Sequence, residues 1–267
     1  MDGSVECEAG FMSSNGMRFG GIGVVSRLRN PSKAARAIAY ADDCSGLVSP
    51  MVLVGPGAEK WAEKRGFALI DPNVLAGKRT NELWKKALNA VETVNCFEEI
   101  NMDTVGAVSV TGDVAEACTS SGGLILKSPG RVGHCTVFGS GLWAEKQGGT
   151  CIGVTVSGCG EAIVRADFCR SLSKRLFTRN SQELPSEVIR TFFEREFLNL
   201  SLMSTITPSR LYVGGLVLLK ENDERYELIV FHNTPVLPFA YRKGSTIRKS
   251  LSQLPAECKI LVESYIC

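Results

Sequence analysis

Residues 103–123 decide the fold, and they read Asp-Thr-Val-Gly-Ala-Val-Ser-Val-Thr-Gly-Asp-Val-Ala-Glu-Ala-Cys-Thr-Ser-Ser-Gly-Gly. The run 104–110 has the composition of a strand, 111–113 is typical of a turn, and 114–120 returns as a second strand. This order predicts a β-hairpin. The preceding segment, 95–103, has no hydrophobic period and carries acidic side chains, as exposed connections do. Thr104 therefore stands where an exposed connection enters a central strand.

Outward from the hairpin, short apolar strands alternate with helical patterns. Strands in the centre with helices outside predict an α/β fold, a four-layer α-β-β-α sandwich. The glycines in 20–23 precede β-branched residues instead of a helix, so we expect them to let a strand pack closely and not to bind a nucleotide. The expected strands are 5–9, 20–26, 51–54, 152–156, and a hairpin of 210–220 with 225–232; the expected helices are 31–41, 57–65, 80–94, 161–176 and 185–200.

The composition is that of an ordinary globular protein. Of 267 residues, 44% are hydrophobic and 22% are charged, and the net charge is +2. This balance indicates neither nucleic acid nor an anionic membrane as a partner. The longest apolar run, 211–219, is too short to span a bilayer, and the first residues lack the features of a signal peptide. We expect one intracellular domain, in the cytoplasm, with nuclear import left open.

The ten cysteines are scattered without a C-x-x-C pair, so most are expected to be buried thiols. Because the chain has two histidines, His134 and His232, a zinc site would need distant thiolates to converge. The sequence therefore predicts no metal site and no cofactor. A nucleophile pair of His134 and Cys135 is disfavoured, because the two are neighbours without a visible group to orient the imidazole.

Thr104 gains a possible chemical role from its position. If the bond after Asp103 were cut, Thr104 would carry both a hydroxyl and a free α-amine. That amine, with an ordinary pKa of about 7.7–8.0, can act as general base for its own Oγ, which suits a chain with few histidines. The alternative interpretation is that Asp103 ends a loop and Thr104 begins a strand, with no further role.

Two other segments could contact a substrate. Ser157-Gly158-Cys159-Gly160 precedes an expected helix, where backbone amides could stabilise developing negative charge. The same pattern is also typical of an ordinary strand-to-helix turn. Arg131 lies in the glycine-flanked loop 129–133, where its guanidinium could bind a carboxylate through two hydrogen bonds, or could simply be solvated.

Taken together, the motifs resemble a known family. The runs 103–110, 118–124 and 127–133 resemble the plant-type asparaginase family of N-terminal nucleophile hydrolases. Within it, Ser-Ser-Gly-Gly-Leu at 120–124 and the runs 139–145 and 156–161 are most similar to the threonine aspartase (taspase) branch, which cleaves proteins. The resemblance extends from about residue 6 to the C-terminus and is strongest over 103–161.

The resemblance implies roles for individual residues. Thr104 matches the nucleophile, exposed by self-cleavage after Asp103, and Ser121 matches the hydroxyl residue that polarises it. Arg131 matches the arginine that holds the substrate carboxylate. The residues that match the surroundings of the oxyanion are Ser157 and Gly158, and His134 stands where small-molecule asparaginases carry an aspartate that binds the substrate amine.

The resemblance also implies an activity. A single hydrolase domain over 1–267 would be made as a zymogen and split into 1–103 and 104–267, and two such pairs would form a homodimer. The enzyme would be a threonine endopeptidase that cleaves protein substrates after an exposed aspartate, nuclear regulatory proteins among them, without a metal or cofactor. The loss of an anion at His134 favours this branch.

Two alternatives stay open. One is an asparaginase or β-aspartyl peptidase that acts on small substrates. The other is a non-catalytic relative, because the family's first strand, its helix and an asparagine-containing loop precede the point that matches the start of this chain. The family's Glu-x-Asp-Ala motif is also altered here to Glu6-Cys7-Glu8-Ala9.

Overall fold

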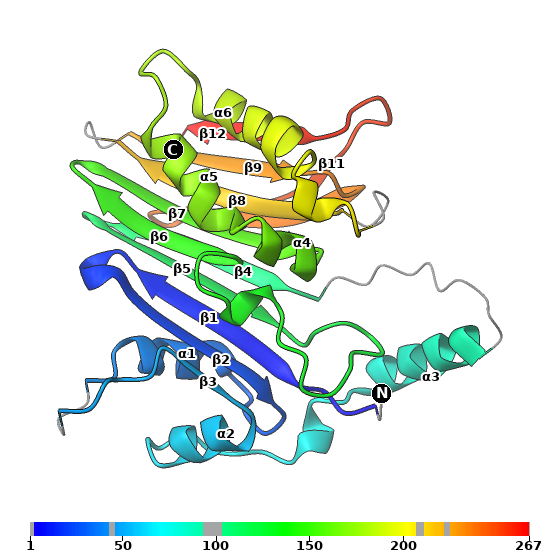
Figure 1. Ribbon diagram of the computed structural model, residues 1–267. Helices are drawn as coiled ribbons and strands as arrows, with labels where there is room; N and C mark the ends of the chain where they lie inside the picture. The colour runs from blue at the N-terminus through cyan, green and yellow to red at the C-terminus, as the bar shows by residue number, and fades with distance from the viewer. Residues whose placement is uncertain (1–2, 43–45, 93–102, 207–210, 222–224, 267) are drawn as a thin grey trace. The chain divides into compact units, whose positions relative to one another are not determined.

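The computed structural model describes residues 3–42, 46–92, 103–206, 211–221 and 225–266 (Figure 1). Its strands are β1 (Cys7–Ser13), β2 (Arg18–Val25), β3 (Val52–Val54), β4 (Val105–Thr111), β5 (Val114–Ser121), β6 (Leu142–Gln147), β7 (Thr150–Gly158), β8 (Val213–Lys220), β9 (Tyr226–His232), β10 (Val236–Lys243), β11 (Thr246–Gln253) and β12 (Leu261–Ile266). Its α-helices are α1 (Pro31–Ala39), α2 (Gly55–Glu63), α3 (Lys78–Glu92), α4 (Gly160–Arg165), α5 (Phe168–Phe177) and α6 (Pro185–Thr191).

The strands form two five-stranded sheets, in the orders β3-β2-β1-β5-β4 and β12-β9-β8-β7-β6, and a two-stranded β10-β11 ribbon. The α/β class expected from the sequence is confirmed. The chain divides into two compact units. The first comprises Met1–Phe11, Phe19–Val105 and Thr119–Val137, and the second comprises Met12–Arg18, Gly106–Cys118 and Phe138–Cys267. The helices that the structure describes include none long and apolar enough to cross a membrane.

In the first unit, helix α1 packs closely on strand β2. Its buried face consists of Ala34, Ala35 and Ile38. A Cβ atom at Gly20 would lie 2.1 Å from the backbone oxygen of Ala35, so no larger residue fits there. The glycine-rich run 20–23 therefore serves strand packing, as the sequence predicted. Strand β3 pairs with β2 in parallel, with Ile22 opposite Leu53.

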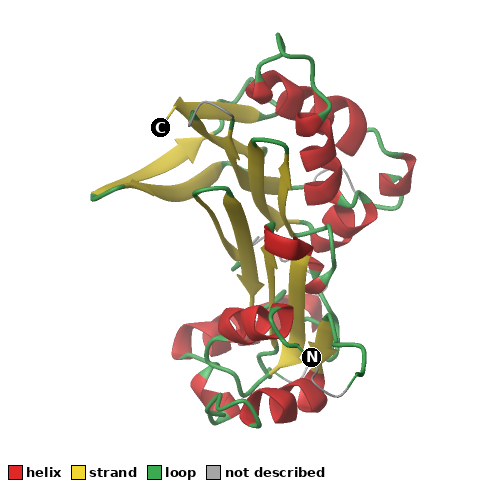
Figure 2. Ribbon diagram, turned by 90° about the vertical axis from the view of Figure 1, so that its left-hand side faces the viewer, coloured by secondary structure: helices red, strands yellow, loops and turns green. Residues whose placement is uncertain are grey.

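In the second unit, the sheet is antiparallel throughout, and helices α4, α5 and α6 lie on one of its faces (Figures 1 and 2). The core of this layer is aromatic. The ring of Phe168, fully buried in α5, lies 5.0–6.3 Å from four other phenylalanine rings. These are Phe192, Phe193, Phe197 and Phe231.

The structure corrects several expected elements. The helix expected over 161–176 is two helices, because Asp167 adopts a left-handed conformation with φ of 46°. Amides at the start of α5 then donate to loop carbonyls, Cys169 to Ser140 (3.3 Å) and Arg170 to Gly139 (2.9 Å). The helix expected over 185–200 is α-helical to Thr191 and π-helical over Phe192–Phe197. Strands β6, β10, β11 and β12 had not been predicted from the sequence.

Candidate active site

The predicted nucleophile lies where the sequence placed it. Thr104 is half-buried and directly precedes β4, and Asp103 before it is exposed. The predicted hairpin is confirmed as β4 and β5. The connection that the sequence analysis expected over 95–103 lies outside the described residues except for Asp103.

The carboxylate of Asp103 is held at the end of β5. Its Oδ1 accepts a hydrogen bond from Ser121 Oγ (2.8 Å), and its Oδ2 accepts one from the backbone amide of Gly122 (2.5 Å). Ser121 Oγ in turn accepts from the amide of Gly123 (3.0 Å). A Cβ atom at Gly122 would lie 2.7 Å from Asp103 Oδ2, so the close approach of the carboxylate requires glycine. Thus Ser121 lies beside the residue that precedes Thr104.

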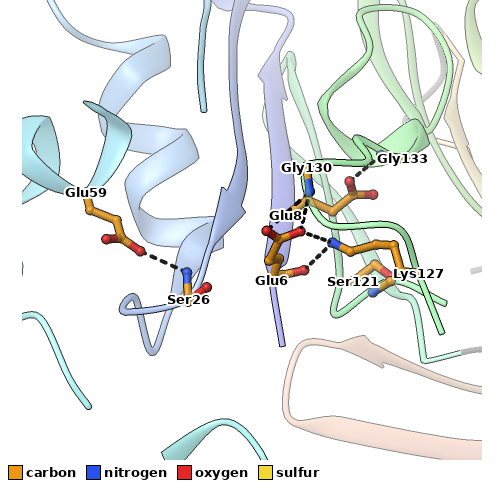
Figure 3. Close-up of polar contacts among 9 residues, drawn as sticks. Glu6, Glu8, Ser26, Glu59, Ser121, Lys127, Gly130 and Gly133 are labelled. Carbon is orange, nitrogen blue, oxygen red and sulfur yellow. Dashed lines mark hydrogen bonds and ion pairs between the residues drawn. The ribbon is translucent and has the colours of Figure 1, made fainter. Parts of the chain in front are cut away.

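A cavity of about 590 Å³ in the first unit adjoins Asp103 and Gly122. In its lining, a half-buried ion pair between Lys127 Nζ and Glu6 Oε2 (3.1 Å) joins the loop after β5 to the residue before β1. Lys127 Nζ also donates to the Glu6 carbonyl (3.0 Å), and the amide of Gly130 donates to the Glu6 carboxylate (2.9 Å; Figure 3). Other side chains that line the cavity are those of Val5, Leu83, Trp84 and Leu124.

The sequence reasoning missed the roles of Glu6 and Lys127, although both stand in motifs that it examined. Their separation in sequence hides their pairing, since a charge pair across loops has no local signature. Arg131, the predicted carboxylate ligand, follows this fixed segment and is half-buried, and its amide donates to the carbonyl of Ser128 (3.1 Å).

His134 begins a short 3-10 helix, His134–Thr136, and is buried. The carboxylate of Glu8, also buried, accepts hydrogen bonds from the amides of Gly133 (2.5 Å) and Cys135 (3.4 Å) on either side of His134. A Cβ atom at Gly133 would lie 2.3 Å from Glu8 Oε1, so this contact too requires glycine. Figure 3 shows Glu8 pointing toward Gly133. The structure therefore brings a carboxylate to His134 that the sequence analysis did not connect with it.

The other histidine is part of the core of the second unit. His232 is fully buried, its Nδ1 lies 2.8 Å from the Thr234 carbonyl, and its Nε2 lies 2.9 Å from Ser252 Oγ. Burial lowers its pKa from the ordinary value, which favours the neutral ring. His232 is therefore a satisfied structural histidine.

Ser157 and Gly158 end strand β7 in the second unit. Gly158 has a φ of 153°, and a Cβ atom there would lie 2.1 Å from the Tyr212 carbonyl. That carbonyl accepts a hydrogen bond from the Cys159 amide (2.7 Å), so one amide of the Ser-Gly-Cys-Gly segment is used within the fold. The turn into α4 is thus built on close backbone packing, and the oxyanion roles of Ser157 and Gly158 stay predictions.

The cysteine thiols near these segments are poor nucleophiles. Burial raises the pKa of the Cys7 thiol, and the charge of Asp103 raises it further. Burial also raises the pKa of the Cys118 thiol to about 11. Since the thiolate is the reactive form, both side chains stay protonated and unreactive at neutral pH. The expectation that most of the cysteines are buried holds for Cys135, Cys151 and Cys169, whereas Cys7, Cys118 and Cys159 are half-buried and Cys258 is exposed.

Comparison with known proteins identifies the family. Residues 1–186 match the family described as Asparaginase. A plant-type L-asparaginase of Pyrococcus furiosus is 31% identical over 181 residues, 64% of this chain and 56% of the relative. An isoaspartyl peptidase of Escherichia coli is 34% identical over 174 residues, 62% of this chain and 51% of the relative.

An isoaspartyl peptidase/L-asparaginase of Xenopus laevis is 30% identical over 183 residues, 68% of this chain and 56% of the relative. The chain spans about half the length of these curated relatives. The matched residues, 1–186, include every candidate site residue named above. On this match, the chain belongs to the asparaginase family of hydrolases.

Proposed function

We propose that this chain carries the nucleophile of an amidohydrolase that acts on small aspartyl amides, L-asparagine or β-aspartyl dipeptides. The observation that supports this most directly is the binding of Asp103 by Ser121 and Gly122, immediately before Thr104. These two hydrogen bonds fix the side chain of Asp103, and Thr104 must attack the main-chain carbonyl of the same residue during self-cleavage. The sequence pattern and the local geometry thus favour the same bond.

The proposed activation takes place at the Asp103–Thr104 bond. Thr104 Oγ attacks the Asp103 carbonyl, the C–N bond breaks, and the Asp103 acyl group moves to the oxygen as an ester while the nitrogen becomes the free α-amine. Water then hydrolyses the ester. The released amine accepts the hydroxyl proton in the next attack, as in other nucleophiles that carry their own base.

In substrate turnover, Thr104 Oγ attacks the side-chain amide carbon of the aspartyl compound. The amine or ammonia leaves with a proton, and an aspartyl ester remains on Thr104. Water hydrolyses this ester and regenerates the hydroxyl. Arg131 binds the substrate carboxylate through its guanidinium, and the family resemblance assigns Ser157 and Gly158 to the surroundings of the oxyanion. The homodimer of cleaved pairs also stays a proposal.

The choice of small substrates rests on two observations. The relatives described above are named for asparaginase and isoaspartyl peptidase activities. In addition, the carboxylate of Glu8 lies within 4.8 Å of the His134 imidazole. A buried anion therefore adjoins the position where the family's aspartate binds a substrate ammonium, although residue 134 itself is a histidine.

A threonine endopeptidase that cleaves proteins after aspartate is the second candidate. The observation that favours it is His134 itself, since a neutral or cationic imidazole gives a free ammonium less stabilisation than a carboxylate does. A peptide substrate has an amide at that position in place of an ammonium, so the absence of a carboxylate there does not weaken its binding. The two candidates share Thr104 and its activation and differ in this subsite.

One experiment tests the shared mechanism and separates the candidates. Denaturing electrophoresis of the purified chain should show fragments 1–103 and 104–267, with Thr104 as a new N-terminus. Thr104→Ala should stay intact, and the control Thr111→Ala, at the other end of β4, should cleave normally. Uncleaved wild-type chain with a cooperative thermal transition would contradict the mechanism.

Cleaved protein is then assayed side by side on L-asparagine, β-aspartyl-glycine and a blocked peptide that contains Asp-Gly. The proposal predicts faster release of ammonia or glycine from the two small compounds. Faster cleavage of the blocked peptide would replace the first candidate with the second.

A further inference from the structure

A buried cluster of three potential metal ligands lies in the first unit. Glu8 comes from β1, and His134 and Cys135 come from the 3-10 helix more than a hundred residues later. Each offers one ligand atom, and the three atoms lie within 4.8 Å of one another. We propose that these three side chains form a binding site for a zinc ion.

The donor set suits zinc. A carboxylate oxygen, an imidazole nitrogen and a thiolate sulfur are the three ligand types that Zn²⁺ takes in proteins. The two anions, Glu8 and the Cys135 thiolate, would neutralise the charge of the cation within a buried environment. Glu8 is 4% exposed, His134 4% and Cys135 0%. Three protein ligands leave the fourth tetrahedral position for water.

The ligand atoms of His134 and Cys135 lie close to the spacing of a bound site, and the widest separation within the cluster is at most 4.8 Å. Tetrahedral bonds of about 2.0–2.3 Å place ligand atoms roughly 3.3–3.8 Å apart. The distance from Cys135 Sγ to His134 Nε2 is 4.0 Å, so a movement of a few tenths of an ångström brings the pair into range. On binding, the Cys135 thiol releases its proton to solvent, and the thiolate donates an electron pair to the metal.

The backbone also orients the carboxylate for this role. The amides of Gly133 and Cys135 donate to the two oxygens of Glu8 and hold it against the turn that carries the other two ligands. Hydrogen bonds of this kind orient ligands in established metal sites and leave lone pairs for the ion. The sequence predicted no metal site, because a zinc site would have needed distant thiolates; here the distant carboxylate of Glu8 supplies the missing ligand.

The test uses the full chain, freed of metal with a chelator and titrated with Zn²⁺ against a chromophoric competitor. We expect one tight equivalent per chain and a rise in the thermal unfolding temperature with zinc. With Co²⁺ as the probe, we expect the absorption of a tetrahedral site and a thiolate-to-cobalt charge-transfer band. Absence of a tight equivalent would overturn the proposal.

Variants identify the ligands. Cys135→Ser should abolish the charge-transfer band and weaken zinc binding at least about 100-fold, since even outer-sphere changes cost 10–100-fold. Glu8→Gln and His134→Gln should weaken binding while keeping the band, and they decide the matter if Cys135→Ser does not fold. The control Cys258→Ser removes an exposed thiol and should change neither measurement. A charge-transfer band that persists in folded Cys135→Ser would refute the site.

The zinc site shares Glu8 and His134 with the proposed substrate subsite, but it does not depend on self-cleavage at Thr104. Thr104→Ala, which cannot cleave itself, should bind zinc and cobalt as the wild-type chain does. If the wild-type chain binds metal but does not cleave itself, the proposed function fails and the zinc site stands. If it cleaves itself but does not bind metal, the zinc site fails and the proposed function stands.

Discussion

The substitution Ser121→Ala tests whether the hydrogen bond from Ser121 holds Asp103 in the conformation in which the Asp103–Thr104 bond is cleaved. Ser121 Oγ is 2.8 Å from the Asp103 carboxylate, and the residue is 8% exposed. The substitution removes this hydrogen bond and leaves the Gly123 amide without its hydroxyl acceptor. Asp103 keeps its second bond, from the Gly122 amide.

The size of the effect follows from the kind of bond that is lost. A hydrogen bond to a charged group contributes about 1.5–3 kcal/mol. If the bond holds Asp103 in the reactive conformation, its loss raises the barrier by this amount. Since about 1.4 kcal/mol corresponds to a tenfold change in rate, Ser121→Ala should cleave itself roughly ten to a hundred times more slowly than the wild-type chain.

The assay follows the disappearance of the intact chain on denaturing gels after refolding. The matched control is Ser120→Ala, because Ser120 is the preceding residue of β5 and its Oγ donates to a different partner, the Glu8 carbonyl (3.0 Å). This control should cleave at nearly the wild-type rate. A rate for Ser121→Ala within about twofold of wild type, or an equal slowing of both variants, would refute the reasoning.

Two further predictions concern the stability of the second unit. Phe168→Ala removes a fully buried ring that contacts four others. It should lower the free energy of unfolding, measured by urea denaturation, by about 3–5 kcal/mol. The control Phe138→Ala, at a residue that is 38% exposed, should lower it clearly less, and equal losses would contradict the assigned core. Hydrogen bonds from Lys146 and Lys220 lower the pKa of Asp113 from 3.8 to about 2. Because the folded-state pKa lies below the unfolded one, Asp113 stabilises the fold above pH 3.8, and this contribution disappears as the pH falls through about 2. Thermal unfolding temperatures of wild type and Asp113→Asn should therefore converge between about pH 4 and 2; parallel curves would argue against the pairing.

Local sequence patterns predicted the parts of this protein that local physics controls. The hairpin around Thr-Gly-Asp at 111–113 forms as expected, because turn chemistry and strand propensity act over a few residues. The same holds for the hairpin of β8 and β9. Gly20 was correctly interpreted as a packing glycine, since the β-branched residues that follow it exclude a nucleotide loop.

Elements set by long-range contacts escaped the sequence analysis. The helix break at Asp167 depends on loop carbonyls at Gly139 and Ser140, which receive the first amides of α5. Strand β11 is exposed along most of its length and therefore has no buried alternating face to reveal it. Its pairing with β10 decides its conformation.

The candidate site divides in the same way. The sequence alone determined that Thr104 stands at the start of a strand and that Arg131 lies in the glycine-flanked loop 129–133. Only the tertiary structure showed that Ser121 donates a hydrogen bond to Asp103 and that Glu8 lies beside His134 and Cys135. These contacts join segments far apart in the chain, and a carboxylate has no local preference for a remote amide or imidazole. Its partner is chosen when the chain packs, because a buried charge must find hydrogen-bond donors or a cation wherever the fold brings them.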